Sequence, residues 1–405
     1  TATSFKGDGS NLTGIDATTI KDSGGTVRVQ GNTSGIVITG IATAGKLGIG
    51  FTDTNIKIGS TALDSLTTGV DNAAVGHNAL TANTTGTNNT AVGSQSLTAN
   101  TTGSDNVAVG RRALFANTTA SNNTAVGEAA LVSNTTASNN TALGYASLNL
   151  NTTGALNAAV GKDALKANTT ASQNSAFGAL ALFTNTTGEK NTGLGYYALG
   201  LNTTGNNNTA VGRAALSNNT TADNNTAIGH NALGTNSTGA NNTAVGALAL
   251  DALTTGGNNT AIGYFAATSL TTGTYNVALG QSALEGCVDG SSNVAIGYET
   301  GTADWADNNV AVGFRALKVN TASNNTAIGY DALKANTTGT GNVAVGKGAL
   351  DACTTSVSNV CVGNSAGGSI TTGNGENVCI GNNAAGAMTT GQQNIFIGDN
   401  CAAAA

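Results

Sequence analysis

The stretch NNTAVGSQSLTANTTG at residues 88–103 decides the fold, because closely similar stretches return along most of the chain. Its most constant part is Asn-x-x-x-Gly, which starts at Asn55 and Gly59 and recurs twenty-one times, up to Asn394 and Gly398, with no substitution at either position. The repeat glycines almost always stand seventeen positions apart. Such a unit is too short to be a domain and too regular to be a linker, so we expect each to form one coil of a stacked repeat.

The residues around each repeat glycine predict short strands and turns. Val, Ile or Leu usually precedes the glycine and Ala precedes that residue; two variable residues and Ala follow, and then Leu in 16 of 21 units. Such a unit suffices for two short strands and two turns, but not for a strand-helix-strand unit. We therefore predict an all-β parallel β-roll or β-solenoid of about 21 coils. At about 4.8 Å per coil it forms an elongated rod on the order of 100 Å long.

The 17-residue period divides the chain into two parts. Residues 1–50 lack it and contain short apolar or alternating stretches between glycine-rich turns, which predict a β-rich, shaft-like lead-in module. Residues 51–405 are predicted to form the repeat domain. Two steps, from Gly297 to Gly313 and on to Gly329, are shorter by a single position, and the step after Gly363 is longer by a single position. We interpret these as trimmed or lengthened turns, with a local bend or a contact feature as the alternative.

Strand alternation places Val107 and Val109 on one face and Asn106 and Ala108 on the other. We expect the branched residues to fill the coil. Burying the apolar residues of one face does not clearly offset the conformational entropy lost when a coil becomes ordered. The Ala and Asn face is therefore expected to be buried as well, by packing against identical chains. The invariant Asn are expected to form a hydrogen-bonded ladder, and the Gly to supply positive φ or close backbone approach. Representative ladder positions are Asn89, Asn106, Asn123, Gly93, Gly110 and Gly127.

Composition excludes several classes of function. Aromatic residues make up 4% and charged residues 9%, Pro is absent, and the net charge is −6, which leaves no basic stripe for nucleic acid. No apolar run is long enough to insert into a membrane. Five cysteines are too few for a disulfide framework. Cys361 and Cys379 are interpreted as small buried residues, or alternatively as a bond between neighbouring coils.

No catalytic, cofactor-binding or metal-binding constellation is found in the sequence, so we predict that the protein is not an enzyme. The two histidines, His77 and His230, are nine periods apart, roughly 40 Å along the rod. Carboxylates are scattered over variable positions without a repeated pair suited to acid-base chemistry. An alternative is a depolymerase fibre whose active site lies in a cleft between chains.

The units NNTAVGSQSLTANTTG and NNTAIGHNALGTNSTG resemble the repeats of phage tail-fibre and tail-fibre-domain proteins, and are similar to the shorter repeats in the heads of trimeric autotransporter adhesins. SFKGDGSNLTGI and VITGIATAGKLGIG, in the lead-in, resemble segments of phage structural proteins. The resemblance implies a parallel β-roll, a homotrimer, and a rigid fibre that attaches to a glycan or protein of a host surface. It implies a location in the virion tail fibre, or outside the cell or on its surface.

Two outward features are candidates for recognition. Aromatic residues gather in the two variable positions after the glycine, where ring faces suit carbohydrate. They are Tyr145, Tyr196, Tyr197, Tyr264, Phe265, Tyr298, Phe314 and Tyr330. The second feature is the Thr-Thr pair in successive turns, which suggests a monomeric ice- or glycan-binding solenoid as the alternative function. Against an ice-binding array, consecutive Thr cannot both point outward from a strand, and Asn and charged neighbours interrupt a flat face.

Overall fold

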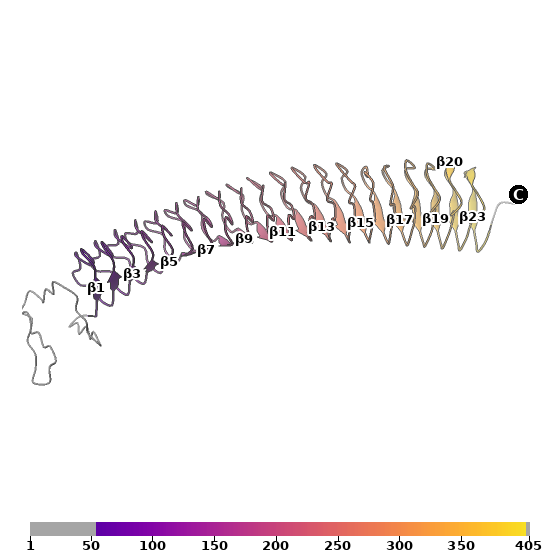
Figure 1. The fold of residues 1–405 in the computed structure, drawn as a ribbon. Helices are drawn as coiled ribbons and strands as arrows, with labels where there is room; N and C mark the ends of the chain where they lie inside the picture. Colours follow the sequence, from indigo (N-terminus) through magenta and orange to yellow (C-terminus); the bar gives the residue numbers. More distant parts are fainter. Residues whose placement is uncertain (1–53, 402–405) are drawn as a thin grey trace, which may run out of the picture. The chain divides into compact units, whose positions relative to one another are not determined.

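The computed structural model describes residues 54–401, which form a parallel β-solenoid with a 17-residue period and contain no helix. The predicted fold class is thereby confirmed, whereas the lead-in module predicted for residues 1–50 lies outside the described residues. Figure 1 shows the coils of the solenoid stacked in sequence order from β1 to β23. We number positions in a coil from its repeat glycine, so that around Gly110 the residue Asn106 is at −4, Ala108 at −2 and Leu114 at +4.

Each coil contributes one three-residue strand, at positions −3 to −1, to a parallel sheet of 21 strands. Every strand pairs in register with the strand of the next coil, as when Ala91 lies opposite Ala108. The strands are β1 Ile56–Ile58, β2 Ala73–Val75, β3 Thr90–Val92, β4 Val107–Val109, β5 Thr124–Val126, β6 Thr141–Leu143, β7 Ala158–Val160, β8 Ser175–Phe177, β9 Thr192–Leu194, β10 Thr209–Val211, β11 Thr226–Ile228, β12 Thr243–Val245, β13 Thr260–Ile262, β14 Val277–Leu279, β15 Val294–Ile296, β16 Val310–Val312, β17 Thr326–Ile328, β18 Val343–Val345, β19 Val360–Val362, β21 Val378–Ile380 and β23 Ile395–Ile397.

The irregular steps leave the sheet in register. Val294 pairs with Val310 across a shortened step, and Val360 with Val378 across the lengthened step. The extra residue of the long step falls in the turn at β20 (Thr372–Gly375), which pairs with β22 (Thr390–Gln392) through a register shift. Turns therefore absorb the length changes, as predicted.

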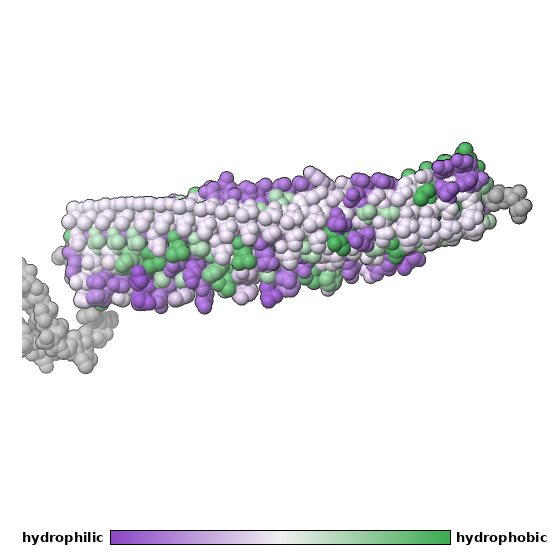
Figure 2. Space-filling model, turned by 90° about the horizontal axis from the view of Figure 1, so that it is seen from above, coloured by the Kyte–Doolittle hydropathy of each residue, from purple (hydrophilic) through white to green (hydrophobic). Residues whose placement is uncertain are grey.

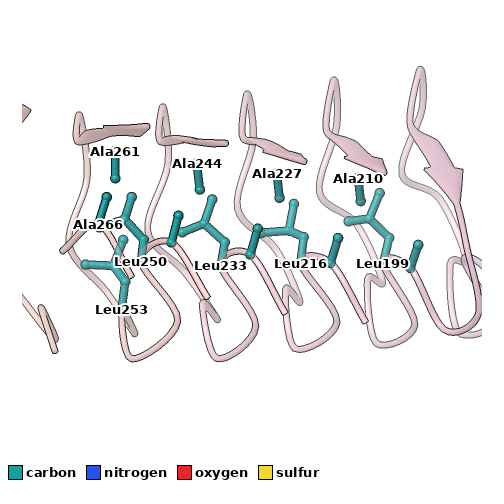
Figure 3. Packing of buried hydrophobic residues seen from close by; sticks show 14 of the residues in the cluster. Leu199, Ala210, Leu216, Ala227, Leu233, Ala244, Leu250, Leu253, Ala261 and Ala266 are labelled. Carbon is teal, nitrogen blue, oxygen red and sulfur yellow. The ribbon is translucent and has the colours of Figure 1, made fainter. Parts of the chain in front are cut away.

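The interior of the coil is lined by small residues from the strand and by leucine from the facing turn. Ala at −2 and Leu at +4 are fully buried along the solenoid, and Figure 3 shows Ala227 and Ala244 pointing from their strands toward Leu216 and Leu233. The predicted assignment of the two strand faces was therefore wrong. The Ala and Asn face fills the coil, whereas the branched residue at −1 lies outside, as at Leu143, which is 46% exposed. The coil is so thin that the strand can offer only a methyl group opposite each leucine.

Each leucine at +4 lies in the left-handed backbone region, with φ 51° at Leu114 and similar values at the other fifteen. This conformation costs a non-glycine residue about 1–2 kcal/mol. Burying a leucine side chain returns about 1.5–3 kcal/mol. The left-handed turn directs the side chain into the coil, so local strain is exchanged for core packing.

Both reasons predicted for the invariant glycines apply. Gly93 has φ 138°, and a Cβ atom built on it would lie 2.5 Å from the carbonyl oxygen of Gly110 in the next coil. Any side chain there collides with backbone, which cannot move without separating the coils.

The predicted asparagine ladder at −4 is present. The backbone N–H of Asn106 donates to Asn89 Oδ1 at 3.1 Å, and Asn106 Nδ2 donates to Asn89 Oδ1 at 3.1 Å and to the Ala120 carbonyl at 2.9 Å. Asn123 bonds to Asn106 in the same way. The buried amides thus join adjacent coils and bind the turn carbonyl that lies three residues before the next ladder asparagine, as Ala120 lies before Asn123.

A second buried ladder lies at +7, which the sequence reasoning treated as a turn position. Asn100 Nδ2 donates to Asn83 Oδ1 at 2.8 Å and to the Gly103 carbonyl at 2.9 Å. The unbroken run ends where Leu253 replaces asparagine, and Asn236 Oδ1 there has no hydrogen-bond partner. Its members are Asn83, Asn100, Asn117, Asn134, Asn151, Asn168, Asn185, Asn202, Asn219 and Asn236. The same side-chain bond returns further along between Asn336 and Asn320.

The coil that starts at Gly297 lacks both the leucine and the ladder asparagine, and Trp305 fills their place. Trp305 is fully buried, and its Nε1 donates to the Leu317 carbonyl at 3.1 Å. A Cβ on Gly301, which occupies the leucine position, would lie 2.5 Å from the Trp305 ring. One large side chain thus replaces two smaller ones.

Four of the five cysteines, Cys287, Cys353, Cys361 and Cys379, are buried. Cys361 and Cys379 stand opposite each other at −2 of adjacent coils, and neither forms a disulfide. A hydrogen bond to the Cys379 thiol, together with burial, raises the pKa of Cys361 well above the ordinary thiol range. Both behave as small interior residues, the first of the two interpretations.

The second ladder can be tested with adjacent asparagines of different exposure. Asn219→Ala removes donors to Asn202 Oδ1 (2.8 Å) and the Ala222 carbonyl (3.0 Å), and an acceptor of Asn236 Nδ2 (3.2 Å). Each buried group left unpaired costs about 1–3 kcal/mol, so we expect a loss of about 2–5 kcal/mol in urea unfolding followed by circular dichroism. Asn218→Ala, at an exposed position, is the control and should change little. Equal unfolding midpoints for both variants would refute a structural role for the second ladder.

Candidate recognition surface

The residue at +1 leaves the coil and points into solvent. It follows a repeat glycine whose φ, near 135°, turns the chain out of the strand. Six of the eight aromatic residues predicted for recognition occupy this column and are 37–52% exposed. They are Tyr145, Tyr196, Tyr264, Tyr298, Phe314 and Tyr330.

The other two predicted residues, Tyr197 and Phe265, occupy +2 and are half-buried. Tyr197 lies 6.3 Å from Tyr196, measured between ring centroids, and Phe265 lies 4.1 Å from Tyr264; both pairs are tilted. Each is a two-ring patch within a single coil. Tyr145 has no ring neighbour among the described residues.

Three aromatic residues from successive coils come together as an aromatic ladder, which we define as Tyr298, Phe314 and Tyr330. The centroid of Phe314 lies 5.6 Å from that of Tyr298 and 5.1 Å from that of Tyr330, with interplanar angles of 15° and 10°. The Arg315 guanidinium lies 4.7 Å from the Phe314 centroid, and Lys347 Nζ lies 5.9 Å from that of Tyr330.

This stacking changes what the ladder can bind. The rings face one another along the solenoid, so both faces of Phe314 are covered and mainly ring edges meet solvent. Carbohydrate stacking on a flat ring face, the basis of the sequence prediction, is therefore blocked at the middle ring. The ladder instead offers ring edges beside charged groups.

Ion pairs flank the aromatic ladder. Arg315 binds Asp331 with two hydrogen bonds, Nε to Oδ1 at 3.0 Å and Nη2 to Oδ2 at 2.9 Å, and Lys318 pairs with Glu299. The hydrogen bond from Lys318 lowers the pKa of the Glu299 carboxyl, and hydrogen bonding to Glu299 raises the pKa of Tyr298. The bidentate bond to Asp331 raises the pKa of Arg315.

The histidines do not form a site. His77 and His230 are exposed at +1 in coils nine periods apart, and His230 Nε2 lies 2.9 Å from Arg213 Nη1. Residues 54–401 contain no group of three or more His, Cys, Asp or Glu placed to hold a metal ion. They also contain no helix long and apolar enough to span a membrane.

A shallow open hollow of about 270 Å³ interrupts the turn side of the solenoid near Trp305. Asp304, one of the two carboxylates that line it, already accepts a hydrogen bond from the Val288 N–H to its Oδ1 at 2.8 Å. The hollow lies where the shortened coils have trimmed turns. Its lining residues are Asp289, Asp304, Trp305, Ala306 and Thr321.

Sequence reasoning identified the aromatic column but missed its charged partners. Arg315 and Asp331 share position +2 in adjacent coils, so aligning the columns through the short steps would have placed them side by side. The stacking of ring on ring follows from the same alignment. The side-chain directions needed the structure.

Comparison with known proteins assigns no relationship. No protein-family description matches the chain, and no curated protein sequence matches it. The function proposed below therefore rests on the solenoid, its surface and the resemblance of its repeats.

The aromatic ladder is expected to stabilise the coils it joins. Phe314→Ala removes two ring contacts, each worth about 0.5–1.5 kcal/mol, so we expect a loss of about 1–3 kcal/mol. Hydrogen exchange at the backbone amides of residues 298–330 should report it, because stability in a repeat protein is transmitted mainly between neighbours. Tyr145→Ala removes an exposed ring without a partner and should leave exchange nearly unchanged. Similar exchange in the two variants would contradict a stabilising stack.

Proposed function

We propose that the protein is a structural attachment fibre, of the tail-fibre kind or a similar extracellular appendage, rather than an enzyme. The observation that carries the proposal is the solenoid itself: 21 strands in register, held by buried amide ladders, with variable residues confined to outward columns. Such a body is a spacer whose length is set by coil number. The quoted repeats that resemble phage fibre proteins support the same assignment.

An uncharged surface stripe, apolar in every coil at position −1, supports assembly with identical chains. We define the strand stripe as positions −3 and −1 of the long sheet, which carry no charged residue in any of the 21 strands. Soluble monomers rarely expose apolar patches beyond a few hundred Å². The large exposed residues at −1 are Ile58, Val92, Leu143, Phe177, Leu194, Ile228, Ile262, Leu279, Ile328, Val362, Ile380 and Ile397.

We place the interface of the proposed homotrimer on this strand stripe. The Ala and Asn face first expected to meet partner chains is buried inside each coil. The branched residues at −1 are exposed instead, and they form the apolar surface that a partner chain would bury. A stripe that runs the length of the sheet suits partners that run side by side.

Light scattering on the intact chain tests the assembly. We expect a mass of about three times 39.3 kDa. Ile262→Lys with Leu279→Lys puts two charges on the strand stripe and should yield smaller species, because a buried unpaired charge costs several kcal/mol. Gln281→Lys, exposed at +1, is the control and should keep the wild-type mass. A folded, monomeric wild-type protein would exclude the trimer.

Recognition is proposed to lie in the aromatic patches at +1 and +2 and at the aromatic ladder, with a surface glycan or protein as target. Tyr196 and Tyr264 are about half exposed, and each is paired with the ring that follows it. Unlike the stacked rings of the aromatic ladder, these tilted pairs suit contact with a sugar ring.

A glycan array identifies the target. Tyr196→Ala with Tyr264→Ala should weaken binding to the preferred glycan about fivefold or more, from lost aromatic contact. Gln281→Ala, which removes an exposed non-aromatic side chain from the same column, should bind like the wild type. Failure of the wild type to bind any glycan, or equal binding by both variants, would count against these tyrosines as a glycan site.

A further inference from the structure

A row of exposed threonines runs along the turn side of the solenoid. We define the threonine ridge as position +9, which is threonine and exposed in every coil from Thr68 to Thr272. On the face shown in Figure 2, even pale rows of weakly polar residues run along one edge over the N-terminal part of the solenoid. The ridge residues are Thr68, Thr85, Thr102, Thr119, Thr136, Thr153, Thr170, Thr187, Thr204, Thr221, Thr238, Thr255 and Thr272.

Within the described chain, the ridge hydroxyls have no protein partner, whereas those of the preceding column are all engaged. Thr84 Oγ1 donates to the Thr101 carbonyl at 3.0 Å, and Thr101 Oγ1 to the Thr118 carbonyl at 3.1 Å. The same bond recurs between neighbouring coils up to Thr271. Position +8 therefore fixes the turn, and position +9 presents a hydroxyl and a methyl group to water.

Buried hydrogen bonds next to the ridge fix the spacing of its threonines. The second asparagine ladder, at +7, lies directly before the ridge pair in ten successive coils and is fully buried there. In the other three ridge coils a leucine takes its place, at Leu66, Leu253 and Leu270. Asn117 Nδ2 donates both to Asn100 Oδ1 at 2.9 Å and to the Ala120 carbonyl at 3.0 Å, just past the ridge residue Thr119. Coils in a parallel stack repeat about every 4.8 Å, so the ridge is a row of identical groups at that interval.

The structure removes both objections raised from the sequence. The two threonines lie in a turn, so alternation along a strand does not apply, and from Thr85 onward only the second residue of each pair is exposed. The asparagine before them is inside the coil. Charges lie in other columns, such as Glu189 and Lys190 at +11 and +12, while positions +6 to +10 carry none from Ser65 to Gly273.

We propose that the threonine ridge binds the surface of ice. Small molecules bind in concave pockets, and a projecting row of side chains forms none. A regular, uncharged row of hydroxyl and methyl groups, held by hydrogen-bonded coils, matches a partner that is extended and repeats at a similar interval. The coil spacing is close to a lattice repeat of hexagonal ice, which liquid water and flexible polymers do not share. The inference does not depend on the fibre being trimeric or bound to a host.

The test uses the whole chain and measures uptake into a slowly growing ice front and thermal hysteresis. The ridge variant carries Thr102→Lys, Thr187→Lys and Thr255→Lys, which cut the longest unbroken threonine run from thirteen to four. Its matched control adds the same charges in the same coils, at +1. The control substitutions are Ser94→Lys, Ala179→Lys and Ala247→Lys.

Wild type and control should be taken up into ice and show thermal hysteresis. In the ridge variant both the fraction taken up and the hysteresis should fall at least about threefold, because many weak contacts act together. Circular dichroism melting checks folding; if the lysine variant is unfolded, glutamine at the same three positions replaces it and carries the same expectation. Exclusion of the wild type from ice, or equal loss in ridge variant and control, overturns the proposal. Binding to crystalline cellulose or chitin without uptake into ice also overturns it, in favour of a polysaccharide lattice.

Discussion

The hydrogen bond from one buried asparagine side chain to the next is the interaction on which the rest of the solenoid depends. The amide oxygen at −4 accepts the backbone N–H of the asparagine in the next coil, as Asn89 does from Asn106. The amide nitrogen donates to the carbonyl of the turn that precedes that asparagine, as Asn89 does to Gly103. A buried backbone group without a partner is costly, and a coil this thin has no helix or second sheet to supply one. Asparagine supplies both a donor and an acceptor in a small volume.

Thinness explains the other restricted positions. The strand can place only alanine inside, and the facing turn fills the remaining space with leucine held at positive φ, as at Leu114. The repeat glycines let neighbouring backbones approach closely. Where Trp305 enters, leucine and asparagine are lost together and the coil is shorter by a single position. One large buried side chain there stands in for two smaller ones.

The sequence predicted the fold class, the coil period and the first ladder, because stacked identical columns are visible as a repeat. The prediction of the two strand faces was wrong, because the apolar Val109 was expected inside the coil and the small Ala108 was expected at a contact between chains. Alternation along so short a strand tells that the faces differ, but not which is inside. The second ladder at Asn100 was missed because Asn-Thr-Thr-Gly also reads as a turn. Around Phe314, sequence located the rings but not their mutual stacking.

The irregular steps carry a consequence for how such a chain changes its length. The shortened and lengthened coils keep Val310 and Val378 in the same columns as all other coils, so contacts between neighbours depend on column position and not on the length of the turn. Because each coil bonds to its neighbours through equivalent atoms, adding or removing a whole coil remakes the same bonds at the junction. The reach of the solenoid is therefore a discrete quantity, adjustable in steps of one strand spacing by duplication or deletion of a single repeat.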